Sequence, residues 1–257
     1  MKKLKVLLAV LCIVFVACAV MACRVKDSGS AKTVVNAPVI NSKVYNGEKQ
    51  AATVEASDAY TVIENNGGVN AGEYNVVLKL TDENAYEWKT PDEADTTMLT
   101  LTFSITKAAN EITVLTLADW TYDEQANEPT ATAKFGTPEF TYATSENGEY
   151  TATVPSAVGK YWVKATVEGT TNYDGAIKTA QFEIKKAASA VTTAPAAKTL
   201  VYTGSAQELV TAGAANGGTL NYKLGDGEWG TAIPAATDAG DYKVYYKVVG
   251  DESHSDT

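Results

Sequence analysis

The chain has 257 residues, of which 45% are hydrophobic and 20% charged, and its formal net charge is −10. The hydrophobic fraction is too high for a wholly disordered chain, and the length suits one large domain or a few small ones. The acidic balance argues against a nucleic-acid partner, which requires a basic face. With one His and no Cys after residue 23, there are almost no ligands for a zinc, haem or iron–sulfur cofactor.

Residues 1–22 have the features of a signal peptide. Lys2, Lys3 and Lys5 form a basic start, and the sequence as far as Ala22 is otherwise apolar. Polar residues follow at once, as expected where a mature chain begins. The sequence therefore predicts that the protein is exported and works outside the cytoplasm.

Cys23 follows the small residue Ala22, and residues 20–23 (VMAC) resemble a bacterial lipobox, whose cysteine becomes the acylated first residue. Met21 is an unusual occupant of its position, and Cys18 is a second, poorer candidate. The prediction is cleavage and lipidation at Cys23, which anchors the protein to a membrane, followed by a polar linker over 23–31. Plain secretion and a retained helical anchor remain the alternatives.

Three landmarks recur along the rest of the chain at spacings near 80 residues. The pattern F-x-I-x-K-A-A begins at Phe103 and again at Phe182, which is 79 residues further on. A Gly two residues before a strand-opening Tyr, and an early Tyr followed by turn residues, each occur three times: Tyr74, Tyr161 and Tyr242 for the first landmark, Tyr45, Tyr122 and Tyr202 for the second. The repetition predicts homologous modules at 32–107, 108–186 and 187–257.

Within each module, apolar residues alternate with polar ones at a period of two, which indicates strands with one buried face. Glycine-rich segments between these runs supply turns. In the last such strand, the predicted inward residues are Tyr242, Val244, Tyr246 and Val248. Modules of this size and texture predict an all-β fold of tandem immunoglobulin-like antiparallel β-sandwiches, placed after an N-terminal signal helix.

These motifs resemble the MBG and YDG-type immunoglobulin-like repeats of bacterial surface proteins. The second module is most similar, and the segments that carry the resemblance are 110–113 (NEIT), 120–122 (WTY), 133–138 (AKFGTP), 161–165 (YWVKA) and 172–173 (NY). The third module looks like a sister type, and the first is more divergent, with 84–88 (NAYEW) where the others have Asn172-Tyr173 and His254. The resemblance implies a non-catalytic building block of adhesins and large envelope proteins, with no family-wide active site.

The third module lacks the closing F-x-I-x-K strand of the other two. A strand edge left uncovered in this way promotes aggregation, which native proteins normally avoid. The expectation is that the sequence is the front of a longer polypeptide or a truncated gene product. The alternative is that a partner supplies the strand by β-augmentation.

Catalysis is not predicted. The single histidine, His254, lies in a turn-like stretch near the end of the sequence, where a solvated loop residue is expected rather than a held catalytic base. No phosphate-binding loop is present, and the acidic clusters lack the spacing of a calcium loop. The sequence therefore predicts no enzyme, no metal site and no cofactor.

Two tryptophans are candidates for sugar contact, because β-sandwiches often stack glycans on exposed rings. Trp162 falls on the polar face of its strand, and Trp229 lies in a glycine-rich hairpin. Single exposed aromatic residues are common on protein surfaces, so these are weak candidates. The predicted function is a stiff, monomeric spacer at the bacterial surface. The alternatives are an adhesin that binds glycans or envelope polymers, and an enzyme whose catalytic domain would lie beyond residue 257.

Overall fold

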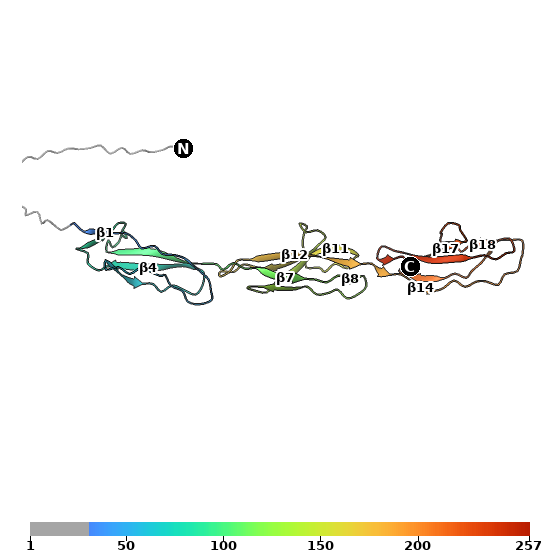
Figure 1. The fold of residues 1–257 in the computed structure, drawn as a ribbon, viewed down its shortest axis with the longest axis horizontal. Helices are drawn as coiled ribbons and strands as arrows, with labels where there is room; N and C mark the ends of the chain where they lie inside the picture. Colours follow the sequence, from blue (N-terminus) through green and yellow to red (C-terminus); the bar gives the residue numbers. More distant parts are fainter. Residues whose placement is uncertain (1–30) are drawn as a thin grey trace, which may run out of the picture.

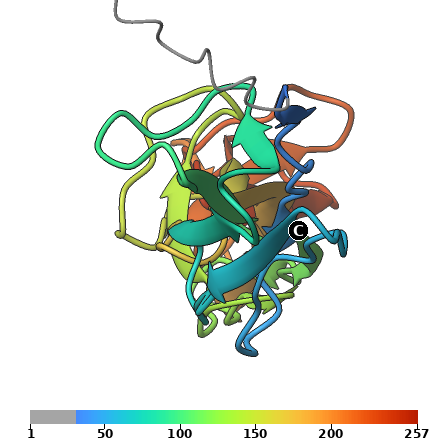
Figure 2. The same cartoon turned by 90° about the vertical axis from the view of Figure 1, so that its left-hand side faces the viewer.

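The computed structural model describes residues 31–257, and every regular element among them is a β-strand. The predicted signal peptide, Cys23 and all but the last residue of the predicted linker lie outside these residues. Figure 1 shows three groups of strands, arranged end to end along one long axis. Figure 2, turned by 90°, shows them overlapping within one compact outline. We call the groups module 1 (β1–β6), module 2 (β7–β12) and module 3 (β13–β20).

Module 1 is built on a four-stranded sheet with the order β2-β6-β4-β3. A separate parallel pair, β1 with β5, packs against it through Trp88, whose ring lies 5.4 Å from that of Tyr60. The six strands are β1 (Thr33–Val35), β2 (Lys43–Val44), β3 (Tyr60–Glu64), β4 (Gly72–Leu80), β5 (Tyr86–Trp88) and β6 (Met98–Thr106).

Module 2 repeats this design, with a sheet in the order β10-β11-β12-β8. The pair β7–β9 forms the second layer, because Ile112 packs on Ala165 and Val167 of β11. The six strands are β7 (Ile112–Thr116), β8 (Trp120–Thr121), β9 (Thr130–Ala133), β10 (Glu139–Ala143), β11 (Gly159–Val167) and β12 (Ala176–Lys185).

Module 3 has a smaller central sheet, in which β17 pairs with β19 alone. Around it lie the short pairs β14–β16 and β15–β18, and β20 pairs with β13 at the boundary to module 2. The eight strands are β13 (Ala187–Ala188), β14 (Ala190–Thr193), β15 (Gln207–Glu208), β16 (Ala214–Asn216), β17 (Gly218–Leu224), β18 (Ala235–Ala236), β19 (Val244–Gly250) and β20 (His254–Ser255).

The predicted all-β class and tandem sandwich architecture are confirmed. Period-two alternation places Val76 and Leu78 of β4, and Val163 and Ala165 of β11, in the cores with no exposed surface. The sheets are not purely antiparallel, however. In modules 1 and 2, a two-residue strand that ends just before the early Tyr pairs in parallel with the last strand: β2 with β6, and β8 with β12.

In module 3, the strand that follows the repeated Gly-x-Tyr landmark, β19, departs from the prediction. Val248 is fully buried, but Tyr242 and Tyr246 are 41% and 42% exposed. In module 2 the corresponding residue, Tyr161, is covered by Phe182 of β12, with 5.8 Å between ring centroids. Among the described residues, no strand of module 3 occupies that position, so the inward face of β19 is only partly covered.

The three strand-opening tyrosines each make the same kind of hydrogen bond. The hydroxyls of Tyr74, Tyr161 and Tyr242 each donate to the backbone carbonyl four residues earlier, at 2.7, 3.0 and 2.9 Å. A tyrosine that bonds back to the preceding chain at the start of a strand is typical of immunoglobulin-like sandwiches. The contact recurs in all three modules and supports their common origin.

Candidate functional site

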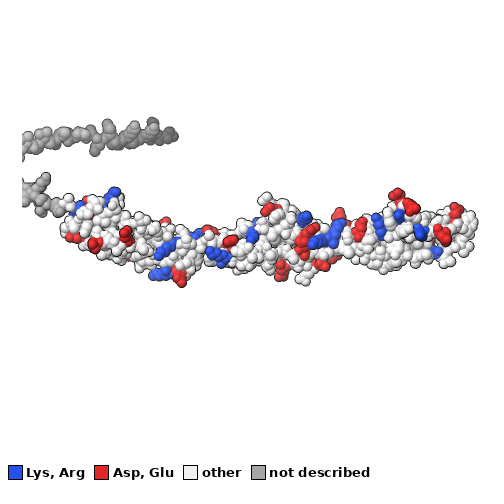
Figure 3. Space-filling view, viewed as in Figure 1, with Lys and Arg blue, Asp and Glu red and all other residues white. Residues whose placement is uncertain are grey.

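The described residues contain no group of three or more His, Cys, Asp and Glu side chains that could hold a metal ion. The same range contains no helix that is long and apolar enough to cross a membrane. Acidic and basic side chains alternate along the face seen in Figure 3. The candidate sites among the described residues are the two tryptophans, the junctions between modules, and a groove in module 3.

Trp162 lies on β11, on the face opposite the buried Val163, as the alternation predicts. Its cross-strand neighbours are Ala143 of β10 and Gln181 of β12. The residue is half-buried, because the strands on both sides flank the ring. No ring pair among the described aromatic residues includes Trp162, so no second ring extends its surface.

Trp229 lies in the predicted hairpin beside β17 and is 39% exposed. The ammonium groups of Lys223 and Lys247 lie 5.4 and 4.9 Å from its ring centroid, and Lys223 is also 5.3 Å from the ring of Tyr245. Such cation–π contacts stabilise the position of a ring. Trp162 and Trp229 belong to different modules, so the two candidates do not form one site.

The junction between modules 1 and 2 depends on Asn172. Its side-chain oxygen accepts a hydrogen bond from the backbone N–H of Ala71 at 2.9 Å, and its amide nitrogen donates to the side-chain oxygen of Asn70 at 3.0 Å. The next residue, Tyr173, pairs in parallel with Ala108 at the start of module 2. The sequence marks this position as a repeated landmark but does not indicate that it contacts the preceding module.

The corresponding loop of module 3 carries His254, and here the expectation of a solvated loop residue is wrong. Its side chain is only 13% exposed and lies edge-on to Tyr122 of module 2, with 5.6 Å between ring centroids. Nδ1 of His254 lies 2.7 Å from Oδ1 of Asp251, and this hydrogen bond is the largest cause of the lowered pKa of Asp251. The histidine is held by the parallel pairing of β20 with β13, which sequence alternation cannot reveal.

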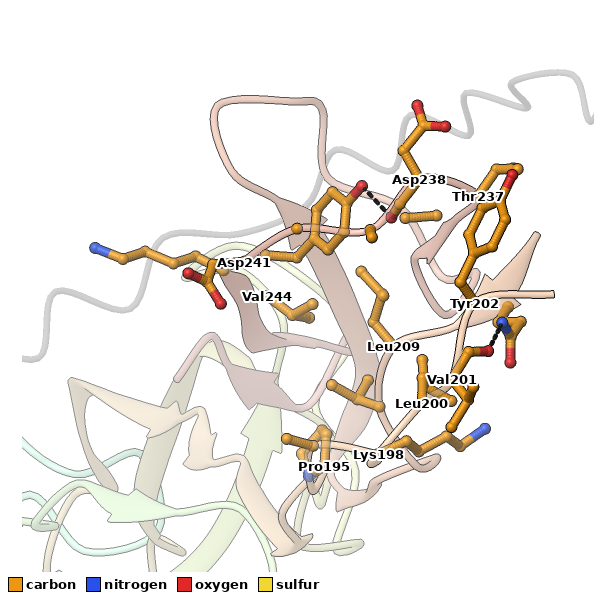
Figure 4. Close-up of a pocket in the computed structure, with 18 of the residues that line it drawn as sticks. Pro195, Lys198, Leu200, Val201, Tyr202, Leu209, Thr237, Asp238, Asp241 and Val244 are labelled. Atoms are coloured by element: carbon orange, nitrogen blue, oxygen red, sulfur yellow. Dashed lines mark hydrogen bonds between the residues drawn. The ribbon is translucent and has the colours of Figure 1, made fainter. Parts of the chain in front are cut away.

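A cavity of about 720 Å³ opens on the inward face of module 3. In Figure 4, Val244 lies on one side of this space, Leu200 and Val201 lie on the other, and Leu209 lies between them. Tyr242 and Tyr246 also line it. We call this space the β19 groove. No prediction from the sequence located it.

No protein family matches the chain, and no curated protein matches it. Among solved structures, the chain is similar to the crystal structure of Drosophila N-cadherin EC1-4, with 13% sequence identity and a TM-score of 0.28, over 88% of this chain and 70% of that one. This similarity is too weak to carry a conclusion about function. The strand arrangement itself shows a tandem array of β-sandwich modules, and the resemblance to MBG and YDG-type repeats stays a prediction.

Proposed function

We propose that the protein is a non-catalytic component of the bacterial cell surface, in which three sandwich modules form a stiff stalk. The observation that carries this proposal is the direct contact at both junctions, which lie in an end-to-end array (Figure 1). In module 2, Asn172 in the loop between β11 and β12 contacts module 1, and in module 3, His254 in the segment after β19 contacts module 2. A linker without such contacts would let neighbouring modules reorient freely.

The junction between modules 2 and 3 carries several polar contacts. The ammonium group of Lys186 donates to the carbonyl oxygens of Asp251 and His254, at 2.9 and 3.3 Å. Within module 3, the N–H of Ala187 donates to the carbonyl oxygen of Ser253 at 3.0 Å, which holds the segment that carries His254 next to the junction. A hydrogen bond contributes about 0.5–1.5 kcal/mol, so a few together with the Tyr122–His254 ring contact favour one relative orientation.

Attachment to the membrane follows from the predicted signal peptide and from Cys23. An acylated Cys23 would anchor the stalk, and an acidic, exported rod would stay soluble and be repelled by anionic envelope polymers. Palmitate labelling of the chain expressed in a bacterium tests the anchor. The label should disappear in Cys23→Ser, and a label that persists would contradict acylation at Cys23 and direct attention to Cys18.

Stiffness is tested by pulsed electron–electron double resonance, which measures the distance between two spin labels attached to cysteines. The method suits this chain because residues 24–257 contain no cysteine of their own. Spin labels at Asn75→Cys of β4 and Ile177→Cys of β12 lie on exposed strand positions of adjacent modules. A narrow distance distribution is expected, which Asn172→Ala should broaden. The matched control is Asn127→Ala, since Asn127 donates only to Ala118 and Asp119 within module 2. A broad distribution in the parent chain would contradict the proposal.

A second candidate, glycan binding, is favoured by the exposed rings of Trp229 and Tyr245, which both lie near the ammonium group of Lys223. Stacking on such rings is a common way to hold a sugar. The test is retention of residues 24–257 on a glycan array and on insoluble polysaccharides, with Trp229→Ala and Trp162→Ala measured in parallel. Retention that either variant abolishes would make the protein an adhesin, and the absence of retention would favour the stalk.

A further inference from the structure

The outer face of the sheet formed by β17 and β19 carries aromatic and basic side chains. Tyr222 of β17 and Val248 of β19 are buried on the inner face. Side chains alternate between the two faces of a strand, so Lys223, Tyr245 and Lys247 lie on the outer face. Lys223 is directly opposite Tyr245 in the register of the two strands, which pair along their whole length. This face is therefore the one opposite the β19 groove.

Trp229 joins the outer face from the hairpin at the other edge of β17. The N–H of Tyr222 donates to the carbonyl oxygen of Gly230 at 2.7 Å, and the N–H of Gly230 donates back to Tyr222 at 3.0 Å. The bridge is antiparallel, so Trp229, one residue before Gly230, lies beside Lys223. The four side chains that share this surface are called the outer patch: Lys223, Trp229, Tyr245 and Lys247.

Both lysines of the outer patch approach the same ring. Their ammonium groups lie 5.4 Å (Lys223) and 4.9 Å (Lys247) from the ring centroid of Trp229. No ion pair among residues 31–257 includes either lysine, although Glu228 is the neighbour of Trp229 in the sequence. Like charges placed close together on a sheet are unfavourable, and an anion between them relieves the repulsion. In a chain with a net charge of −10, this surface is a local site for negative charge.

Module 2 has the same arrangement with one lysine instead of two. The segment after β10 bridges back to that strand in the same way, which places Tyr150 in the position of Trp229. The ammonium group of Lys164 lies 4.0 Å from the ring centroid of Tyr150. Ala143 of module 2 stands where module 3 has Lys223. Module 3 thus adds a second cation to a ring-and-lysine pair that is present in both modules.

We propose that the outer patch binds a carboxylate-bearing sugar, a uronic acid unit of an acidic polysaccharide. The inference rests on the glycan-binding candidate above and specifies its ligand. The apolar face of the sugar ring packs on Trp229 and Tyr245, which are 39% and 46% exposed, and the carboxylate accepts hydrogen bonds from Lys223 and Lys247. Hydrogen bonds between charged groups are stronger than neutral ones. An acidic peptide fits less well, because its carboxylate side chains have no flat face to lie on the rings.

The test uses residues 24–257 and matched pairs of sugars. Trisaccharides of galacturonate and of mannuronate are each measured beside their methyl esters, which are neutral, by isothermal titration calorimetry at low salt. We expect at least one acid to bind about tenfold more tightly than its ester, and the difference to shrink as salt is added. Equal binding of acids and esters would overturn the proposal and leave glycan binding in place, whereas no binding of any sugar at millimolar concentration would contradict both.

Substitutions locate the bound sugar. Lys223→Gln and Lys247→Gln should each weaken binding of the acid about fivefold, and Lys247→Arg, which keeps the charge, should retain it. The matched control is Lys198→Gln, which removes the same charge from module 3, where Lys198 pairs with Glu208 at 2.8 Å. It should leave binding unchanged. An equal loss in Lys198→Gln would show attraction by the charge of the whole module and would contradict a site at the outer patch.

A hexaglutamate peptide separates recognition of a sugar from attraction by charge alone. It should bind at least about tenfold more weakly than the acidic trisaccharide, because it cannot stack on the rings. Trp229→Ala should weaken binding of the trisaccharide and leave that of the peptide unchanged. A peptide that binds as tightly as the sugar would overturn the proposal and make the outer patch a site for acidic polypeptides.

Discussion

Modules 2 and 3 place the same strand-opening tyrosine in two different environments. In module 2, Phe182 stacks between the rings of Trp120 and Tyr161, at 5.0 and 5.8 Å, and meets Tyr142 edge-on at 6.1 Å. In module 3, the central sheet has two strands and its core cluster has four buried residues, Val210, Leu220, Tyr222 and Val248. The comparison indicates that the last strand, rather than the tyrosine, completes the aromatic core.

The largest expected effect comes from removing the centre of that aromatic core. Phe182→Ala should lower the free energy of unfolding of module 2 by about 3–5 kcal/mol, the usual cost of losing a fully buried aromatic side chain. The measurement is denaturant unfolding in a variant that keeps Trp120 as its one tryptophan. Ile177→Ala on the same strand is the control, because Ile177 is 66% exposed. Similar losses for the two variants would mean that the aromatic cluster does not stabilise the module.

A smaller effect compares the two tyrosines directly. Tyr161→Ala should destabilise module 2 by about 1 kcal/mol more than Tyr242→Ala destabilises module 3, because Tyr161 stacks on an aromatic partner and Tyr242 does not. Both variants lose the same hydroxyl-to-carbonyl hydrogen bond, so this contribution cancels. Unfolding of module 3 is followed through Trp229. Equal losses would show that the two sites are energetically alike despite the different covering strands.

The smallest effect concerns the ion pair that fastens the end of β12. Asp119 accepts from the N–H of Glu183 at 2.9 Å and pairs with Lys185 at 3.0 Å. The hydrogen bond from Lys185 is the largest cause of the lowered pKa of Asp119, and the hydrogen bond to Asp119 is the largest cause of the raised pKa of Lys185.

A lowered carboxyl pKa stabilises the folded state above the ordinary value of 3.8, and this contribution is lost as the pH falls through the folded value. A raised ammonium pKa stabilises below the ordinary value of 10.5 and is lost as the pH rises through the folded value. The stability difference between the parent chain and Asp119→Asn should therefore be largest between these limits. A difference that does not shrink in acid would contradict this origin.

Sequence patterns predict the parts of the fold that depend on local alternation. Val76, Leu78, Val163 and Ala165 are buried as period two requires, because their strands, β4 and β11, each have a neighbouring strand on both sides. The exposure of Tyr242 could not be predicted in this way, since the pattern of a strand does not reveal whether its partner is present.

The junction contacts escaped prediction for another reason. Asn172 and Ala71 are 101 residues apart, and His254 meets Tyr122 across a module boundary. Nothing local distinguishes a loop residue that reaches a neighbouring module from one that faces solvent. The repetition of the position in three modules is the signal that could have identified it.

Small-angle X-ray scattering of residues 24–257 tests the central claim, an extended stalk with fixed junctions. With strands that rise about 3.3 Å per residue, three modules in line should give a maximum dimension on the order of 100 Å and the skewed pair-distance distribution of a rod. Asn172→Ala should leave each module folded but shorten the average dimension as the first junction bends. A compact particle, or the scattering of freely jointed modules in the parent chain, would contradict the account.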